Sequence, residues 1–297
     1  MRLSVVVPAT NRPPTLPRCL EAIAAAGPDE VIVVETAAGT GPAAARNAGA
    51  ARAGGELIAF VDADVLVHRD AFDRIRDRFA KRPELVAVFG SYDERVATRG
   101  EVAAFRNLLH HTIHQRSQGD VATFWAALGA VRASALAQTD GFDALRYPRP
   151  AIEDIELGTR LAALGPIVLD GEIRGTHLKE WTLGTMIATD FARRGIPWVE
   201  LIHERAEVPS TLNLGRRERA SAGAAFATAI ALVAGRPRVA VLAIAAGVAL
   251  NRDLYAVLAR QRGVRGAAIG VPLHLLHQLT AGAAIPAGLV RGRRRRR

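Results

Sequence analysis

Three short apolar runs within the first 61 residues place the strongest constraint on the fold. They are residues 3–7 (LSVVV), 30–34 (EVIVV) and 57–61 (LIAFV), and each leads into a polar or turn-forming segment. The intervening segments 14–23 and 42–53 begin at prolines, and in the first of them apolar side chains recur at helical spacing. Strands that alternate with helices in this way predict an α/β domain with a mostly parallel sheet and helices on both faces.

The chemistry of such a domain is expected beyond the carboxyl ends of its strands. Here these are residues 8–12, 35–41 and 62–64. In the third, Asp62 and Asp64 directly follow an apolar strand, so two carboxylates are positioned to hold a hard divalent cation and a diphosphate bound to it. For an isolated pair of aspartates, a helix cap or a turn is the alternative interpretation.

Charge and cysteine content restrict the partners of the chain. Its 297 residues include 39 Lys and Arg against 29 Asp and Glu, a formal charge of +10, and residues 291–297 are arginine apart from Gly292. A basic tail suits anionic lipid or nucleic acid. Aromatic residues make up 5% and no basic stripe is interleaved with them, so we expect no nucleic-acid partner. Cys19 is the single cysteine, which excludes a disulfide scaffold and a cysteine-based metal cluster.

The composition changes past about residue 215. Residues 220–235, 239–250 and 267–290 are uncharged. As a helix the third stretch would span about 36 Å, enough for a hydrocarbon core of about 30 Å, whereas the first two are shorter. We therefore expect a catalytic domain over residues 1–215, which looks complete by about residue 205, and an Ala-rich helical, membrane-associated region with a basic tail over 216–297. A soluble Ala-rich helical bundle is the alternative.

Arginines flank these uncharged stretches, and the positive-inside rule assigns them to the cytosol. The apolar run at the amino terminus is too short for the core of a signal peptide. We expect the protein at the cell membrane with its catalytic domain on the cytoplasmic face, and an even number of membrane crossings.

Six sequence blocks together point to a known family. They are residues 5–12 (VVVPATNR), 31–35 (VIVVE), 41–49 (GPAAARNAG), 61–64 (VDAD), 140–143 (DGFD) and 152–158 (IEDIELG). In this order, over about residues 3 to 181, they resemble a family 2 glycosyltransferase with the GT-A fold, in a membrane-attached subgroup. The chain differs from the usual pattern in having Glu35-Thr36 in place of Asp-Asp, and Asp140-Gly141 in place of Gly-Gly.

The resemblance implies an inverting glycosyltransferase. Such an enzyme moves a sugar from a nucleotide-diphosphate donor, most often UDP-linked in the family, to an acceptor hydroxyl or phosphate. The uncharged carboxyl-terminal stretches, rather than the resemblance, are the basis for expecting a lipid or lipid-linked acceptor. The resemblance further implies Mg²⁺ or Mn²⁺ held by Asp64, with Asp62 sharing the metal or positioning the ribose and His177 completing the shell. A structural role is the alternative for His177. Asp154 is then the base that takes the acceptor proton, for which a helix cap is the alternative role.

We expect two further sets of site residues, the first of which includes Asp62 again. The donor-binding set is Pro8, Thr10, Asn11, Arg12, Glu35, Arg46, Asp62 and Lys179, and the acceptor-side set is Glu153, Trp125, Trp181 and His110. The last of these belongs to a histidine cluster, His110, His111 and His114, for which lining of the acceptor site, ordinary helix surface and a metal site all stay open.

Two other functions compete with glycosyl transfer. A nucleotidyltransferase normally has a Gly-rich amino-terminal loop with a lysine for the triphosphate, but no lysine precedes Lys81. A non-catalytic membrane scaffold on a degenerate transferase fold is the second rival, and the presence of Asp62, Asp64 and Asp154 together argues against it. The sugar, the acceptor and the linkage stay open.

Overall fold

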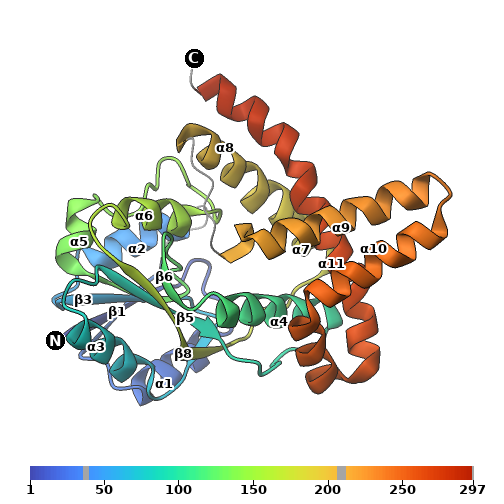
Figure 1. Cartoon of the computed structure of the whole chain (residues 1–297). Helices are drawn as coiled ribbons and strands as arrows, with labels where there is room; N and C mark the ends of the chain where they lie inside the picture. The colour runs from blue at the N-terminus through green and yellow to red at the C-terminus, as the bar shows by residue number, and fades with distance from the viewer. Residues whose placement is uncertain (36–39, 206–211, 296–297) are drawn as a thin grey trace. The chain divides into compact units, whose positions relative to one another are not determined.

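The computed structural model describes residues 1–35, 40–205 and 212–295 (Figure 1). The chain divides into two compact units. One consists of Met1–Ala97 with His114–Lys179 and the other of Thr98–Ile113 with Glu180–Arg297. We call them the sheet unit and the helical unit. Thr36, and the last two arginines of the predicted basic tail, lie outside the described residues.

The sheet unit is built on one mixed sheet with strand order β2-β1-β3-β7-β5-β8-β4 and β6 paired to β8. Strand β1 pairs in parallel with β2 and β3, and β5 pairs in parallel with β8. Strand β7 is antiparallel to β3 and β5, and β8 is antiparallel to β4 and β6. The strands are β1 Leu3–Pro8, β2 Glu30–Val34, β3 Leu57–Val61, β4 Val65–Val67, β5 Ala87–Tyr92, β6 Gly119–Val121, β7 Leu128–Arg132 and β8 Ile167–His177.

The predicted α/β fold class and its first three strands are confirmed, but the sheet is mixed rather than mostly parallel, because four of the seven strand pairings among the described residues are antiparallel. Strands β2 and β3 have the predicted bounds, and β1 extends one residue further, to Pro8. All residues of β1 and β3 are buried, which explains why their sequences are continuously apolar rather than alternating. The antiparallel pairings come from later strands that the sequence analysis did not delimit.

Helices cover both faces of this sheet, as predicted. In Figure 1, α1 and α3 lie on one face and α2, α5 and α6 on the other. Helix α2 begins at the predicted Pro42 but ends at Ala50, three residues early, whereas α1 begins at Leu16 rather than at Pro14. The bounds are α1 Leu16–Ala25, α2 Pro42–Ala50, α3 Ala71–Lys81, α5 Ala133–Gln138 and α6 Glu153–Leu161.

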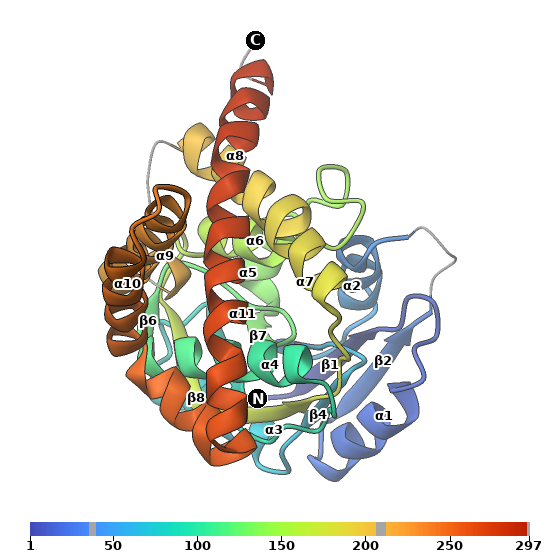
Figure 2. The same ribbon diagram turned by 90° about the vertical axis from the view of Figure 1, so that its right-hand side faces the viewer.

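The helical unit contains most of α4 and the helices from residue 183 onward. Helices α9 and α10 form an antiparallel hairpin (Figure 1). The long helix α11, which packs along α8 (Figure 2), is interrupted at Gly263, whose φ of 70° lies in the left-handed region. The bounds are α4 Glu101–Arg116, α7 Leu183–Ala188, the π-helix η1 Thr189–Gly195, α8 Ile196–Arg205, the short 3-10 helix η2 Leu212–Leu214, α9 Arg216–Val233, α10 Pro237–Leu250 and α11 Arg252–Arg295.

One stretch of the described residues, Arg252–Arg293, is long and apolar enough to cross a membrane. It contains the third uncharged stretch of the sequence, while α10 is apolar but shorter. A core helix of a soluble protein meets the same criterion, so the crossings and the orientation stay predictions. The domain boundary at residues 215 and 216 also stays a prediction, since the compact units are not functional domains.

Candidate functional site

The turn after β3 and the end of β8 bring the predicted metal ligands together. Val65 of β4 lies opposite His177 in the antiparallel register, and the Leu178 amide donates to the carbonyl of Asp64 at 2.8 Å. This pairing holds the His177 Nε2 atom 3.5 Å from the Asp64 Oδ2 atom. The two residues are 113 positions apart, so strand register, rather than local sequence, builds the pair.

The charge of Asp64 is stabilised by its neighbours. Burial by itself would raise the pKa of Asp64, but the hydrogen bond and charge of His177 and the charge of Lys179 together hold that pKa below its usual value. Asp64 is therefore an anion at neutral pH, as a metal ligand must be. Lys179 lies two residues after His177, and its place beside the donor phosphates stays a prediction.

Tyr92 is part of this site and was not predicted. Its ring stacks on His177 with centroids 4.1 Å apart and planes within 9°. The contact fixes the plane of the imidazole, so that its Nε2 atom stays directed at Asp64. Tyr92 ends β5, whose register with β8 pairs it with Gly175. The sequence shows a tyrosine at a strand end, but the register needed to place it is not visible there.

Arg46 connects the aspartates after β3 to the start of α6. Its guanidinium donates to Asp62 Oδ1 at 2.7 Å and to Glu153 Oε1 at 2.9 Å. The side chain is 5% exposed and lies over the ring of Phe142. The sequence analysis placed Arg46 in the donor site and Glu153 on the acceptor side; in the structure the two bind one another.

The pKa of Asp62 moves in the opposite direction to that of Asp64. Burial and the nearby charge of Asp64 raise it above the usual range, although Arg46 opposes the shift. Because one carboxylate oxygen of Asp62 is bound to Arg46, Asp64 is the better placed of the two for a cation.

Asp154 occupies the first turn of α6, as the sequence analysis expected. One carboxylate oxygen accepts the amide of Ile155 at 2.9 Å, and the other accepts the amide of Ala126 at 3.3 Å. Both bonds come from the backbone and the side chain stays half-buried. The carboxylate is thus held in one orientation while part of it faces solvent.

The predicted donor residues after β1 and β2 form a more exposed group. Pro8 ends β1, and the next amide, of Ala9, donates to Val34 at the end of β2. Asn11 and Arg12 have positive φ values of 63° and 43°. Such values are uncommon for residues other than glycine and concentrate at functional sites.

The Arg12 guanidinium binds the Glu35 carboxylate at 2.7 Å, with both side chains largely exposed. Both residues belong to the predicted donor-binding set, and Thr10 of the same set is half-buried.

Asn47, next to Arg46 on α2, is a second residue that the sequence analysis did not select. Its amide nitrogen donates to the carbonyl of Phe142 at 2.7 Å, and its amide oxygen accepts the Phe142 amide at 2.8 Å. The side chain therefore satisfies both backbone groups of one residue in the 140–143 block. In the sequence, only its position inside the 41–49 block indicated that Asn47 could belong to the site.

The predicted aromatic and histidine residues are divided between the units. Trp125 is buried in the sheet unit, where its ring makes edge contacts with Tyr92 at 4.8 Å and with His114 at 4.9 Å. The Nδ1 atom of His114 bonds the carbonyl of Gly90. In the helical unit, Trp181 packs against the guanidinium of Arg106 at 4.9 Å. His110 lies on α4, half-buried.

One family model matches part of the chain. Residues 24–140 match the model of glycosyl transferase family 2. Over these residues the chain is similar to glycosyl transferase family 2. The match includes β2, β3 and the D-x-D turn, and stops at the left-handed Asp140. None of the curated proteins matches the chain in sequence.

Solved structures show the same GT-A fold. The mannosyltransferase PcManGT from Pyrobaculum calidifontis, in complex with GDP-Man and Mn²⁺, is 16% identical with a TM-score of 0.56; the match covers 96% of this chain and 86% of that one. TarS 1-349 from S. aureus, in complex with UDP-GlcNAc, is 14% identical with a TM-score of 0.50, over 94% and 91% of the two chains. At these identities the likeness concerns the fold.

The side chains of this site could supply some, but not all, of the ligands of a divalent cation. Asp64 offers carboxylate oxygen and His177 offers imidazole nitrogen, ligands that Mn²⁺ accepts readily. Among the described residues, no group of three or more His, Cys, Asp or Glu side chains is arranged to hold a metal ion. A cation at Asp64 and His177 would therefore need further oxygen ligands, which the diphosphate of a nucleotide sugar supplies.

Proposed function

We propose that this chain transfers a sugar from a nucleotide-diphosphate donor to an acceptor hydroxyl, with inversion at the anomeric carbon. The observation that carries the proposal is the position of Arg46, which binds Asp62 of the D-x-D turn and Glu153, the neighbour of Asp154. One buried cation thus joins the D-x-D turn, where the donor diphosphate is expected, to the start of α6, which carries Asp154.

Each residue then has a defined task. Asp154 accepts the proton of the acceptor hydroxyl as the acceptor oxygen bonds to the anomeric carbon, and the bond from that carbon to the diphosphate oxygen breaks. The electron pair of that bond leaves with the nucleotide diphosphate. Lys179 contributes positive charge beside Asp64, where the diphosphate is expected. A cation held by Asp64 and His177, with Asp62 beside it, would neutralise charge on the leaving diphosphate.

The finer parts of the proposal concern the donor and the acceptor. The two structures with this fold are complexes with GDP-Man and with UDP-GlcNAc, so both a purine and a pyrimidine nucleotide occur on it. We infer a UDP-sugar donor, with Glu35 accepting from the uracil ring. We further infer a lipid or lipid-linked acceptor at the cell membrane, with the catalytic domain on the cytoplasmic face; the apolar helices of the helical unit support this part.

The test is a donor panel with the full-length protein. Nucleotide-diphosphate release from each nucleotide sugar is measured with Mn²⁺ and with excess EDTA, in the presence and absence of host lipid extract. We expect release from one sugar class, dependence on the metal, and stimulation by the extract. Pyrophosphate release from a nucleoside triphosphate would instead support a nucleotidyltransferase, and no release with any donor would support a scaffold.

Variants separate the roles of the two aspartates. Asp154→Asn should lower kcat by about 10²-fold or more while the affinity for the nucleotide diphosphate, measured by calorimetry, changes little. Asp64→Asn should weaken nucleotide binding in Mn²⁺ but not in EDTA. Asp77→Asn, on the exposed face of α3, is the matched control and should behave as the parent protein. Loss of nucleotide binding in Asp154→Asn would contradict its role as the base.

A further inference from the structure

The hairpin of α9 and α10 exposes a large apolar surface. Val233 is 93% exposed, Leu242 is 70% and Ile230 is 67%. Monomeric soluble proteins rarely leave large apolar side chains exposed in one continuous group. The hairpin surface, as we call this group, consists of Phe226, Ile230, Leu232, Val233, Val239, Val241 and Leu242.

The packing of the helical unit leaves this surface uncovered. Helix α10 has one buried residue, Ala240, within the described structure. Its exposed positions include Val239, Leu242, Ala246 and Ala249, which recur at intervals of three and four and therefore share one face. On α9, Phe226, Ile230 and Val233 repeat in the same way. A water-facing helix would carry charged residues at these positions.

The charges around the hairpin fit an anionic surface. From residue 220 to residue 251 the only charged residues are Arg236 and Arg238, both at the turn between the helices. Arg216, Arg217 and Arg219 begin α9, and Arg252 begins α11. An apolar face bordered by arginines matches a bilayer interface, with hydrocarbon for the apolar side chains and lipid phosphates for the guanidinium groups.

The length of the hairpin indicates how it meets the lipid. Each arm has about 14 apolar or small residues, or about 21 Å of helix, which is too short to cross a hydrocarbon core of about 30 Å. Insertion tip first would also place Arg236 and Arg238 in hydrocarbon. A hairpin lying in the interface keeps both arginines at the phosphates while its apolar face enters the hydrocarbon.

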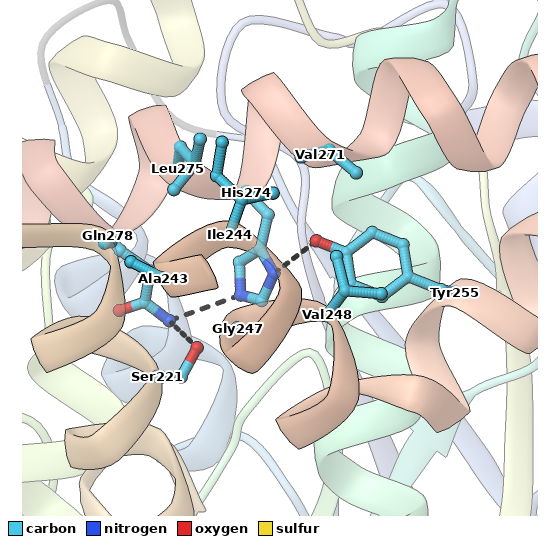
Figure 3. A pocket seen from close by; sticks show the side chains of 11 residues that line it. Ser221, Ala243, Ile244, Gly247, Val248, Tyr255, Val271, His274, Leu275 and Gln278 are labelled. Carbon is cyan, nitrogen blue, oxygen red and sulfur yellow. Dashed lines mark hydrogen bonds between the residues drawn. The ribbon is translucent and has the colours of Figure 1, made fainter. Parts of the chain in front are cut away.

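Helix α11, the longest apolar stretch, has polar residues that bind partners inside the helical unit, although Ile285, Leu289 and Val290 near its end are exposed. His277 binds Asp190 at 2.8 Å. Figure 3 shows His274 bonded to Tyr255, and Gln278 bonded to Ser221 and His274, around a small cavity between α9, α10 and α11. These polar residues of α11 have partners within the unit. A bilayer around α11 would have to replace the helices that supply those partners.

We propose that the hairpin surface lies in the interface of an anionic lipid bilayer and attaches the protein to it as a monotopic membrane protein. This inference rests on the membrane attachment in the proposed function and names the element responsible. It assigns to α11 the role of packing the helical unit together, not of crossing the bilayer.

The test uses the full-length protein and vesicles of phosphatidylcholine, with or without phosphatidylglycerol. Val233→Glu combined with Leu242→Glu should weaken flotation with both vesicle types by at least about tenfold, because two apolar side chains no longer enter hydrocarbon. The matched control is Val264→Glu on α11, which is 84% exposed but outside the hairpin and should bind as the parent does. Nucleotide binding is measured on every sample, so that misfolding or failure of the transferase function is seen separately.

A second pair of variants isolates the charge. Arg236→Gln with Arg238→Gln should reduce binding to phosphatidylglycerol vesicles by about fivefold per arginine, near 30-fold together, and leave binding to pure phosphatidylcholine unchanged. A Val233→Cys variant, labelled with a polarity-sensitive fluorophore, should shift to the blue on vesicles. Cys19 is buried, so the label reacts at the new position.

Three results would overturn the proposal. They are parent-like vesicle binding by the glutamate variant, release of the parent protein from vesicles by high salt alone, and a lipid-free dimer in sedimentation that the glutamate variant dissociates. The last would show that a second copy covers the hairpin surface.

Discussion

A buried arginine organises the candidate site at the level of single residues. Arg46 is predictable from the sequence as a site residue because it lies in the 41–49 block. Its partners Asp62 and Glu153 are 16 and 107 positions away, so their pairing depends on the folded sheet. Lysine offers one point charge where arginine offers a planar fork, so only arginine binds two carboxylates at fixed geometry.

We expect Arg46→Lys to lower the free energy of unfolding by about 3–5 kcal/mol, because at least one buried carboxylate loses its partner. Urea denaturation followed by circular dichroism measures it. Arg12→Lys is the control: its pair with Glu35 has 81% and 47% exposed side chains, so the change should be about 1 kcal/mol or less. Equal effects of the two substitutions would contradict the organising role of Arg46.

At the level of elements, α2 and the 140–143 turn are joined through Asn47 and Phe142. Asp140 and Gly141 both have positive φ, 55° and 72°. A Cβ atom on Gly141 would lie 2.5 Å from the Asn47 Oδ1 atom. Gly141 thus meets two requirements, a left-handed backbone and space for a neighbouring amide. The sequence shows the glycine, but not the amide that approaches it.

Two glycines allow these requirements to be separated. Gly27 has a similar φ of 66°, but a Cβ there would meet nothing within 4 Å. We expect Gly27→Ala to cost about 1–2 kcal/mol from backbone strain alone. Gly141→Ala should cost more, because it also displaces Asn47 from Phe142. The loss of unfolding free energy in Gly141→Ala minus the loss in Gly27→Ala measures the contact between Asn47 and Phe142. A difference of zero would show that Asn47 moves aside freely.

The π-helix η1 carries the buried acid of the helical unit. Arg106 binds Asp190 at 3.0 Å, with the two side chains 8% and 3% exposed, and His277 binds the same carboxylate. Burial by itself would raise the pKa of Asp190, but His277 and Arg106 hold it below its usual value. For Arg106, burial lowers the pKa, because it disfavours the charged guanidinium. π-Helices are frequent at sites under functional constraint.

The sign of the pH effect follows from the lowered pKa. The unfolded state binds a proton at Asp190 more readily than the folded state does, so the stabilisation is complete above a pH of about 4 and is lost as the pH falls through the lower folded pKa. Asp190→Asn should cost about 3–5 kcal/mol at pH 7 and flatten the acid side of the stability profile. Asp253→Asn, whose pair with Arg217 is about one-third exposed, should cost about 1 kcal/mol or less.

At the level of the whole molecule, the sequence predicts the alternating strands and helices of the sheet unit better than it predicts the packing of the helical unit. The residues of β1, β2 and β3 are specified locally by continuous apolar runs. The helices that α11 packs against are not specified locally, since η1 and α8 precede it by tens of residues. This packing has no periodic signature in the sequence, and the expectation that the first domain is complete by about residue 205 did not take it into account and stays a prediction.

A chain that ends at Arg205 tests this packing directly. It would lose α11, so Ile196 and Val199 of α8 would no longer contact Gly288, and Asp190 would lose His277. We expect this chain to be largely insoluble, or to bind a hydrophobic dye and lack near-ultraviolet circular dichroism. A chain that ends at residue 293 is the control and should behave as the full-length protein, because it keeps the contacts of His203 with Gly292 and of Asp190 with His277. A soluble chain ending at Arg205 with one cooperative unfolding transition would show that η1 and α8 fold without α11.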